Sequence, residues 1–206
     1  MKKIQRLCLM AVTVLLFAGL DASAQRIKLN INYGVGIPAS ANFKDYVSNT
    51  SFRGWNANLL YDVNDQLALG LGIGSQSFYQ RYPRAIYKTV EGSDISAVMT
   101  NTVTSMPIMV QGQFNLLPEA TVQPYVGLGV GGNLVLYNQY LGEFGGSSSK
   151  FGFAARPEAG VYIPVGRYKE SSIVIGGAYN YLPIKEDNLK NLNNIGLYAG
   201  FKFPLR

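Results

Sequence analysis

The feature that most constrains the fold of this chain is a two-residue alternation that recurs about eight times. One set of positions is apolar, and the positions between them carry Gly, Asn, Gln and Ser rather than charged residues; residues 27–37 and 67–74 are the clearest examples. This is the period of a β-strand, whose successive side chains point to opposite faces. A soluble strand normally carries Lys and Glu on its wet face, and these strands carry almost none. We therefore expect the apolar face to meet lipid, which predicts a small transmembrane β-barrel.

The first 24 residues have the pattern of a secretory signal peptide. Three cations are followed by an apolar run over residues 7–20 and an Ala-Ser-Ala cleavage site, so cleavage is expected between Ala24 and Gln25. The apolar run is shorter than the roughly 20 residues that a membrane-spanning helix needs. The sequence thus predicts a cleaved signal peptide over residues 1–24 and a single outer-membrane β-barrel domain over residues 25–206.

Eight segments have strand periodicity, each near the length of about 9 to 11 residues that a tilted membrane strand requires. A helical reading fails because the 23 glycines lie largely inside these segments and no 3.6-residue stripe is sustained. The expected strands are 27–37, 52–63, 67–78, 98–114, 122–136, 151–163, 172–182 and 193–203.

The connections between these strands alternate between long and short. The long ones are 38–51, 79–97, 137–150 and 183–192, and the short ones are 64–66, 115–121 and 164–171. Outer-membrane barrels have long extracellular loops and short periplasmic turns. The pattern predicts an all-β fold, an eight-stranded antiparallel up-and-down barrel with both ends in the periplasm. Within it, the Gly-Gly-Ser-Ser-Ser-Lys run at 145–150 is expected to be a flexible extracellular loop.

Aromatic residues fall near both expected membrane boundaries on the lipid-facing positions, as in the aromatic girdles of membrane barrels. The simpler alternative is that strands favour aromatic residues in general. The outer rim would contain Phe52, Trp55, Phe151, Tyr179 and Tyr181, and the periplasmic rim Tyr61, Phe114, Phe201 and Phe203.

The last strand is amphipathic and ends in phenylalanine. Its alternating sets are Ile195, Leu197, Ala199, Phe201 and Phe203 against Gly196, Tyr198, Gly200 and Lys202. In this the chain resembles the family of small Gram-negative outer-membrane β-barrel proteins that includes OmpX, the OmpA barrel and PorT-like proteins. The resemblance implies that Phe201 and Phe203 form the signal read by the barrel-assembly machinery, and that outer-membrane lipid and lipopolysaccharide surround the barrel. The chain departs from the family pattern in having three residues after Phe203.

No motif for catalysis, cofactor binding or metal binding is found. The chain has no histidine, whereas the barrel lipases, deacylases, palmitoyl transferases and omptin proteases need one as base or relay, and its one cysteine lies in the predicted signal peptide. The glycines at 127, 129, 131 and 132 have period two inside a strand and are not a dinucleotide loop. The net charge of +6 is scattered, so nucleic-acid binding is not expected.

Arg156 and Glu158 share the inward parity of their strand. Two unpaired charges in the lumen would be costly, and an eight-stranded barrel is just filled by its own side chains. We therefore expect a buried polar network; the alternative is a narrow path for small solutes. The expected members are Asp62, Gln111, Gln123, Tyr125, Arg156, Glu158, Asn180, Tyr198 and Lys202.

The second long connection interleaves cations with aromatic residues, which suits contacts with lipopolysaccharide phosphates or a partner protein. The other reading is a solvated loop whose charge is partly offset by Glu91 and Asp94. The candidate contact residues are Tyr79, Arg81, Tyr82, Arg84, Tyr87 and Lys88.

These observations favour a non-enzymatic outer-membrane protein with a structural or interaction role, acting through its loops or its lipid-facing wall. Two alternatives stay open. One is a subunit of an envelope protein-export complex, which the resemblance to PorT-like barrels implies, and the other is a narrow channel for small solutes. A soluble lipocalin-like barrel in the periplasm is the structural rival.

Overall fold

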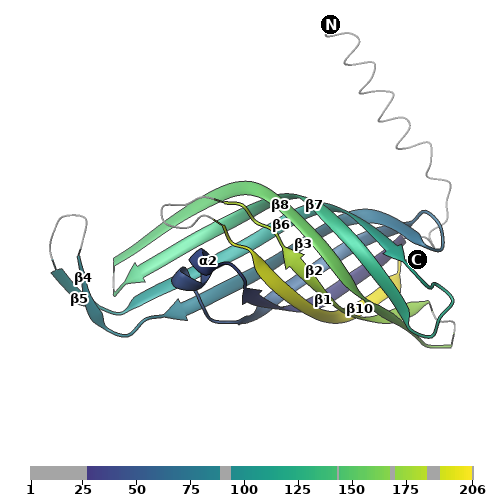
Figure 1. Ribbon diagram of the computed structural model, residues 1–206, viewed down its shortest axis with the longest axis horizontal. Coiled ribbons are helices and arrows are strands. Elements are labelled where there is room, and N and C mark those ends of the chain that lie inside the picture. The colour runs from purple at the N-terminus through teal and green to yellow at the C-terminus, as the bar shows by residue number, and fades with distance from the viewer. Residues whose placement is uncertain (1–26, 89–93, 143, 168–169, 185–190, 206) are drawn as a thin grey trace, which may run out of the picture.

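The computed structural model describes residues 27–88, 94–142, 144–167, 170–184 and 191–205, and these residues form a closed antiparallel barrel of eight strands (Figure 1). The predicted signal peptide, its cleavage site and Glu91 lie outside the described residues. No helix among those residues is long and apolar enough to cross a membrane.

Each barrel strand pairs with its neighbour along the chain, and the first strand pairs with the last from Lys28–Pro204 to Pro38–Asn194. The expected eight-stranded up-and-down barrel is confirmed. Its strands are β1 (Ile27–Pro38), β2 (Ser51–Asp62), β3 (Leu67–Arg81), β6 (Met99–Asn115), β7 (Gln123–Leu141), β8 (Phe144–Val165), β9 (Ser171–Asn180) and β10 (Asn194–Pro204). The connections contain the short helix α2 (Ala41–Tyr46) and a separate hairpin of β4 (Ala85–Lys88) and β5 (Asp94–Ala97).

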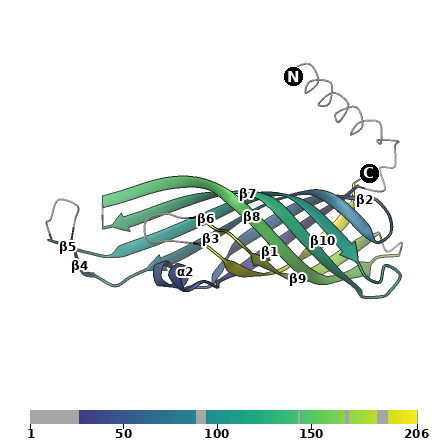
Figure 2. The same cartoon turned by 45° about the horizontal axis from the view of Figure 1, so that its top comes forward.

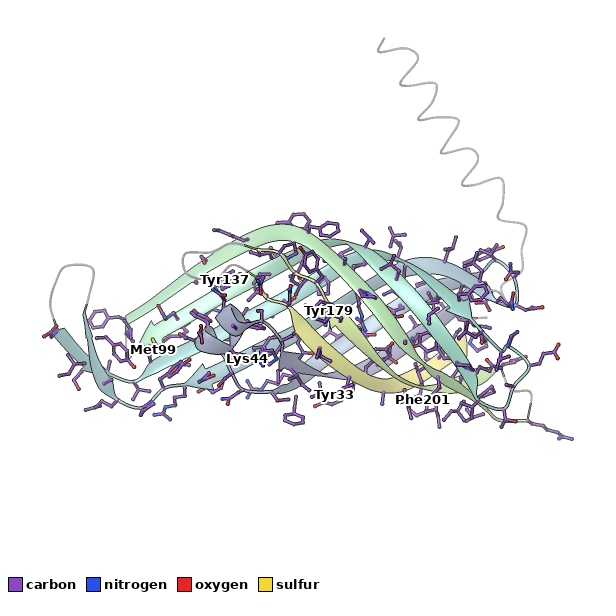
Figure 3. All side chains as sticks on the ribbon, in the orientation of Figure 1. Tyr33, Lys44, Met99, Tyr137, Tyr179 and Phe201 are labelled. Carbon is purple, nitrogen blue, oxygen red and sulfur yellow. The ribbon has the colours of Figure 1, made fainter. Side chains whose placement is uncertain are left out.

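The outer surface of the barrel is apolar because the alternation places the large hydrophobic residues there. Leu71, Val110 and Leu128 are more than half exposed, and Figure 3 shows Tyr33 and Phe201 on the outside as well. The intervening positions point into the lumen and are mostly buried. These outward positions are the ones for which the sequence predicted contact with lipid.

A β-bulge in β2 explains one break in this alternation. Gly34 pairs with Gly54 but Gly36 pairs with Ser51, so β2 has one residue more than β1 between these pairs. Because of the extra residue, Phe52 and Arg53 are both exposed on the outside. Phe52 thus reaches the outer rim although it has the parity of the lumen-facing residues of β2.

Glycines on the inner face make room for the side chains that fill the barrel. A Cβ atom added to Gly72 would lie 2.3 Å from Nε2 of Gln111, and one added to Gly127 would lie 2.9 Å from Cγ of Glu158. Either contact would force the lumen side chain to move. The inward glycines thus leave space that the lumen side chains occupy.

The strands of the barrel do not all extend equally far at its two ends. We call the end at which β2, β6 and β8 finish the short-turn end, and the opposite end, which bears α2 and the β4–β5 hairpin, the long-loop end. At the long-loop end β3, β6, β7 and β8 extend beyond α2 and form what we call the raised wall. The strands β1, β2, β9 and β10 end closer to the middle of the barrel (Figures 1 and 2).

The prediction of a flexible loop at 145–150 was wrong. These residues belong to β8, and Ser147 pairs with Asn138 of β7, so the connection between the two strands is only Gly142 and Glu143. The expected long connection at 137–150 is therefore mostly strand. The opposite β7 segment, with Val135 and Tyr137, has high strand propensity and supplies backbone partners to the weaker Gly/Ser strand. The connection expected at 79–97 is also shorter, because β3 continues to Arg81.

Candidate functional site

The interior of the barrel is divided into two layers of different chemistry. Polar and charged side chains fill the half nearer the short-turn end, which we call the polar lumen. Apolar side chains fill the half nearer the long-loop end. We call this second group the apolar plug; it consists of Phe43, Val47, Phe78, Val103, Met109, Val135, Tyr137, Ala154, Leu182, Ile184 and Leu192.

An ion pair lies at the centre of the polar lumen. Nε of Arg156 is 3.3 Å from Oε2 of Glu158, and both side chains are less than 10% exposed. Nε2 of Gln113 donates a hydrogen bond of 2.7 Å to the other oxygen of Glu158, and the Tyr162 hydroxyl donates to Oε1 of Gln113. The Arg156 guanidinium also lies 5.2 Å from the centroid of the Tyr198 ring. Each buried charge is therefore compensated, as a low-dielectric site requires.

Three tyrosines continue this cluster towards the short-turn end. The hydroxyls of Tyr125 and Tyr198 are hydrogen-bonded at 2.8 Å, and the rings of Tyr125 and Tyr162 are stacked 4.1 Å apart. Nζ of Lys202 lies 4.1 Å from the centroid of the Tyr162 ring, within the range of a cation–π contact. The tyrosine rings fill the cross-section and their polar groups link β7, β8 and β10.

Pairs of polar side chains fill much of the remaining lumen. Three of these pairs join neighbouring strands, and the pair of Gln111 and Asn58 joins β6 to β2 past β3. The pairs are Asn32–Asn56 at 2.8 Å, Gln111–Asn58 at 3.0 Å, Ser105–Asn133 at 2.9 Å and Asn180–Asn194 at 2.8 Å.

All nine residues expected in the lumen network occupy inward positions, but they do not form one network. Tyr125, Arg156, Glu158 and Tyr198 lie together in the central cluster. Gln111 and Asn180 belong to separate amide pairs, and Lys202 contacts only the edge of the cluster.

The other two expected members lie at the short-turn mouth. Oδ2 of Asp62 is 2.5 Å from Nζ of Lys28. Oε1 of Gln123 accepts a hydrogen bond of 3.1 Å from Asn115, and its Nε2 donates to the carbonyl of Pro118. These contacts hold the turns at this end of the barrel.

Sequence reasoning missed Gln113 and Tyr162, although both link the central cluster. The signal was present in the strand parity, because Gln113 is two residues from Gln111 and Tyr162 is four residues from Glu158. Applying the inward parity to every polar residue would have found them.

The apolar plug was also missed, because part of it comes from segments that were expected to be exposed loops. Phe43 of α2 and Val47 just after it are fully buried, and the Phe43 ring meets the Phe78 ring edge-on at 4.9 Å. Their i, i+4 spacing in an otherwise polar loop was the available signal, since it places both on one helix face. Leu182 and Ile184 of the last connection enter the lumen beside them. Between the plug and the polar lumen the structure contains a cavity of only about 50 Å³.

The six aromatic and basic residues predicted as loop contacts are spread over several elements. Tyr79 is exposed on β3 with the Arg53 guanidinium 5.7 Å from its ring centroid, and Arg81 is exposed at the end of that strand. Arg84 is exposed just before β4, and Tyr87 lies on β4. For Lys88 only the backbone at the end of β4 is described.

Tyr82 has a structural contact instead of a free surface position. Its hydroxyl donates to the carbonyls of Asp45 and Tyr46, each at 3.1 Å, and so ties α2 to the end of β3. Partial burial, and next the Asp45 carboxylate, raise the pKa of Tyr82 above its ordinary value.

The upper part of β8 is an edge strand. β9 first pairs with β8 through Ala178 and Glu158, and above this there is only the bridge between Ala155 and Tyr181. Among the described residues, positions 144–153 of β8 have a strand partner only on the β7 side, and the side chains of 144–151 are all exposed. We call residues 144–147, the outermost part of this stretch, the free β8 edge.

The corresponding edge of β3 is covered. The Ser51 hydroxyl donates to the carbonyl of Ser77, and the Asn49 side chain donates to the carbonyl of Tyr79 at 3.4 Å. Two free-edge carbonyls of β3 are thus satisfied by the first long connection. Among the described residues, the edge of this wall that has a strand partner on one side only and no covering contact is the free β8 edge.

The described residues contain no group of three or more His, Cys, Asp or Glu that could hold a metal ion. A family model described as the outer membrane protein beta-barrel domain matches residues 10–203. No curated protein sequence matches the chain.

Among solved structures, the fold is similar to that of Neisserial surface protein A (NspA), at 17% identity and a TM-score of 0.54, covering 86% of this chain and 95% of that chain. It is also similar to OprG from Pseudomonas aeruginosa, at 13% identity and a TM-score of 0.51, covering 86% and 94%. At these identities the likeness concerns the fold alone.

Proposed function

The chain belongs to the outer membrane protein β-barrel family, and from this premise we propose that it is a non-enzymatic surface protein whose barrel anchors a raised strand wall for contact with a partner. The long-loop end is then extracellular and the short-turn end periplasmic, as in other barrels of the outer membrane. Lipid and lipopolysaccharide would surround the apolar outside, and Phe201 and Phe203 would serve the barrel-assembly machinery.

The observation that carries this proposal is the free β8 edge. An exposed edge presents unpaired N–H and C=O groups to which an extended peptide can add as a further strand. Natural edges are usually blunted by charges, proline or bulges. Residues 144–147 have no proline and no charged residue. The partner that fits is an extended, weakly charged segment of another protein.

The filled lumen favours this role over that of a solute channel. The apolar plug lies across the long-loop end, and the central ion pair with its tyrosines occupies the cross-section below it. In planar bilayers we expect the purified barrel to give no reproducible conductance steps. Steady channel openings would instead favour the narrow channel.

The interaction itself is tested by site-specific photo-crosslinking on intact cells. A photoreactive residue at Ser147 on the free β8 edge should give one discrete adduct, and the same residue at Ser96, which is exposed on β5, serves as the matched control. Ser147→Lys should block strand addition by placing a charge on the edge, so a probe moved to Ser149 should then lose its adduct. Equal adducts from Ser147 and Ser96, or none from Ser147, would contradict the proposal.

A further inference from the structure

The short-turn mouth of the lumen contains a cavity of about 440 Å³ that is open to solvent. Its size is within the range of small-ligand pockets. Polar and charged residues from seven strands and the turns line it. Those that matter for its chemistry are Lys28, Asp62, Asp65, Glu119, Ser172 and Lys202.

Lys202 is the unusual member of this lining. Its side chain is on an inward position of β10 and the residue is only 9% exposed, yet its one contact of a polar kind is with the face of the Tyr162 ring. Within the described part of the chain no carboxylate oxygen lies within 4.0 Å of its Nζ. Asp62, which lines the same cavity, is held by Lys28 at 2.5 Å. A buried ammonium group with only a cation–π contact lacks the anion that would compensate its charge.

Two uncharged groups lie beside Lys202 in the strand register. Ser172 is its pairing residue on β9 and lines the cavity, and Asn30 is its pairing residue on β1. Directly paired residues have their Cβ atoms about 4.5–5.5 Å apart, so all three side chains point into the lumen at one level. Neither Nδ2 nor Oδ1 of the buried Asn30 amide has a hydrogen-bond partner within the described residues. An anion held at Lys202 in the cavity would therefore find the Ser172 hydroxyl beside it, with the buried Asn30 amide next to Lys202 behind the cavity lining.

Carboxylates at the rim restrict which anion can enter. Asp65, Glu119 and Glu170 are exposed on the short turns that border the cavity. Their charge repels polyvalent anions more strongly than singly charged ones. A planar carboxylate group has a single negative charge, which limits its repulsion by the rim carboxylates. Its two acceptor oxygens can accept hydrogen bonds from the donors deeper in the cavity.

We propose that this cavity is a binding site for a small monocarboxylate, with Lys202 as the charge partner and Ser172 as the flanking donor. The site faces the opposite end of the barrel from the free β8 edge, and it stands independently of the interaction role proposed above.

The test is an NMR titration of the folded barrel in uncharged detergent micelles with sodium acetate at constant ionic strength. Acetate should shift the side-chain signals of Lys202 and Tyr162 saturably. Lys202→Gln, which removes the charge but keeps most of the chain length, should weaken acetate binding by about tenfold or more, the loss expected for a charge-assisted hydrogen bond. Lys202→Arg should retain binding. Lys44→Gln, at an exposed lysine of α2 at the other end, is the matched control and should leave it unchanged.

A second variant keeps the test decisive if Lys202→Gln does not fold. Asp62→Asn frees Lys28 from its ion pair and adds net positive charge to the cavity, so acetate should bind several-fold more tightly. The proposal is overturned if acetate gives no saturable shift in the native protein, if Lys202→Gln binds as tightly as Lys44→Gln, or if Asp62→Asn leaves the affinity unchanged. Tighter binding of inorganic phosphate than of acetate would overturn the assignment to a monocarboxylate.

Discussion

The polar lumen and the apolar plug occupy the same barrel but are built in different ways. In the polar lumen, side chains of the strands themselves meet inside the barrel, as Glu158 of β8 does with Arg156 of the same strand and with Gln113 of β6. In the plug, residues of the connections, such as Phe43 and Leu182, fold back onto strand residues. The polar lumen belongs to the strands and cannot be disrupted without disturbing the barrel wall. The connections that supply the plug can move away from the wall locally. We therefore expect damage to the polar lumen to unfold the barrel and damage to the plug to open one end.

The largest effect is expected from Glu158→Ala. It leaves the buried Arg156 without its counter-charge and Gln113 without its acceptor, which should lower the free energy of unfolding by about 3–5 kcal/mol. Urea unfolding in lipid vesicles, followed by the fluorescence of Trp55, measures it. The double variant Arg156→Met, Glu158→Met should recover most of the loss because no charge is then left buried. A loss below about 1 kcal/mol for the single variant would contradict the ion-pair account.

In the plug, Phe43→Ala should destabilise α2 by about 3 kcal/mol, the lower end of the cost for a buried phenylalanine. The effect should appear as faster amide hydrogen exchange in residues 41–47, with little change in global unfolding. Phe144→Ala, at a residue that is 69% exposed, is the control and should change neither measurement. If Phe43→Ala lowered global stability as much as Glu158→Ala, the two layers would not be separable.

Gly200→Ala probes the wall that both layers share. A Cβ there would lie 2.0 Å from the carbonyl oxygen of Ile31, so the β1–β10 pair must shift, at a cost of about 1–3 kcal/mol. At Gly146, on the free β8 edge, nothing lies within 4 Å of an added Cβ. Gly146→Ala should therefore stay within about 0.5 kcal/mol of the native protein. If both substitutions lowered the free energy of unfolding equally, crowding on the lumen side would not determine which glycines of the wall can be replaced.

The smallest effect is expected at the tether of α2. Tyr82→Phe removes the hydroxyl that donates to Asp45 and Tyr46, and should weaken the docking of α2 by about 1 kcal/mol. Because the folded pKa of Tyr82 is raised, the tether is complete below the ordinary tyrosine pKa and is lost as the pH rises through the raised value. Hydrogen exchange in α2 is measured at increasing alkaline pH and corrected for the intrinsic rise of the exchange rate with pH. The remaining protection of α2 should fall with pH in the native protein and stay constant in Tyr82→Phe. If the protection of α2 in the native protein did not change with pH, the Tyr82 hydroxyl would not hold α2 to β3.

The sequence predicted the wall and the polar lumen well because both depend on a local period. The apolar residues of a strand, such as Leu71 in β3 and Leu128 in β7, mark its outward positions. The same alternation in β8 and β10 places Arg156 and Lys202 on inward positions. What parity does not give is which inward residues touch, since Gln111 and Asn58 are distant in the chain and meet only after the barrel closes.

The plug and the raised wall depend on long-range packing. Phe43 and Val47 are buried only because the last connection brings Leu182 and Ile184 to the same end. Gly145–Ser149 has the composition of a loop, and it is a strand because β7 continues beside it. The bulge at Phe52 is likewise set by the pairing with β1 and has no signal in the local sequence.

Closure of the ring through β1 and β10 also dictates an order of assembly. Ile37 pairs with Ile195 and Leu29 with Phe203, so the final seam joins segments separated by most of the chain. Such non-local pairing is slow, because the entropy of closing a long loop is lost before any contact is gained. Until β10 has been synthesised, β1 has one edge without its native partner, and the nascent sheet is exposed to wrong partners. Topology alone therefore makes this chain depend on protection between its synthesis and its closure.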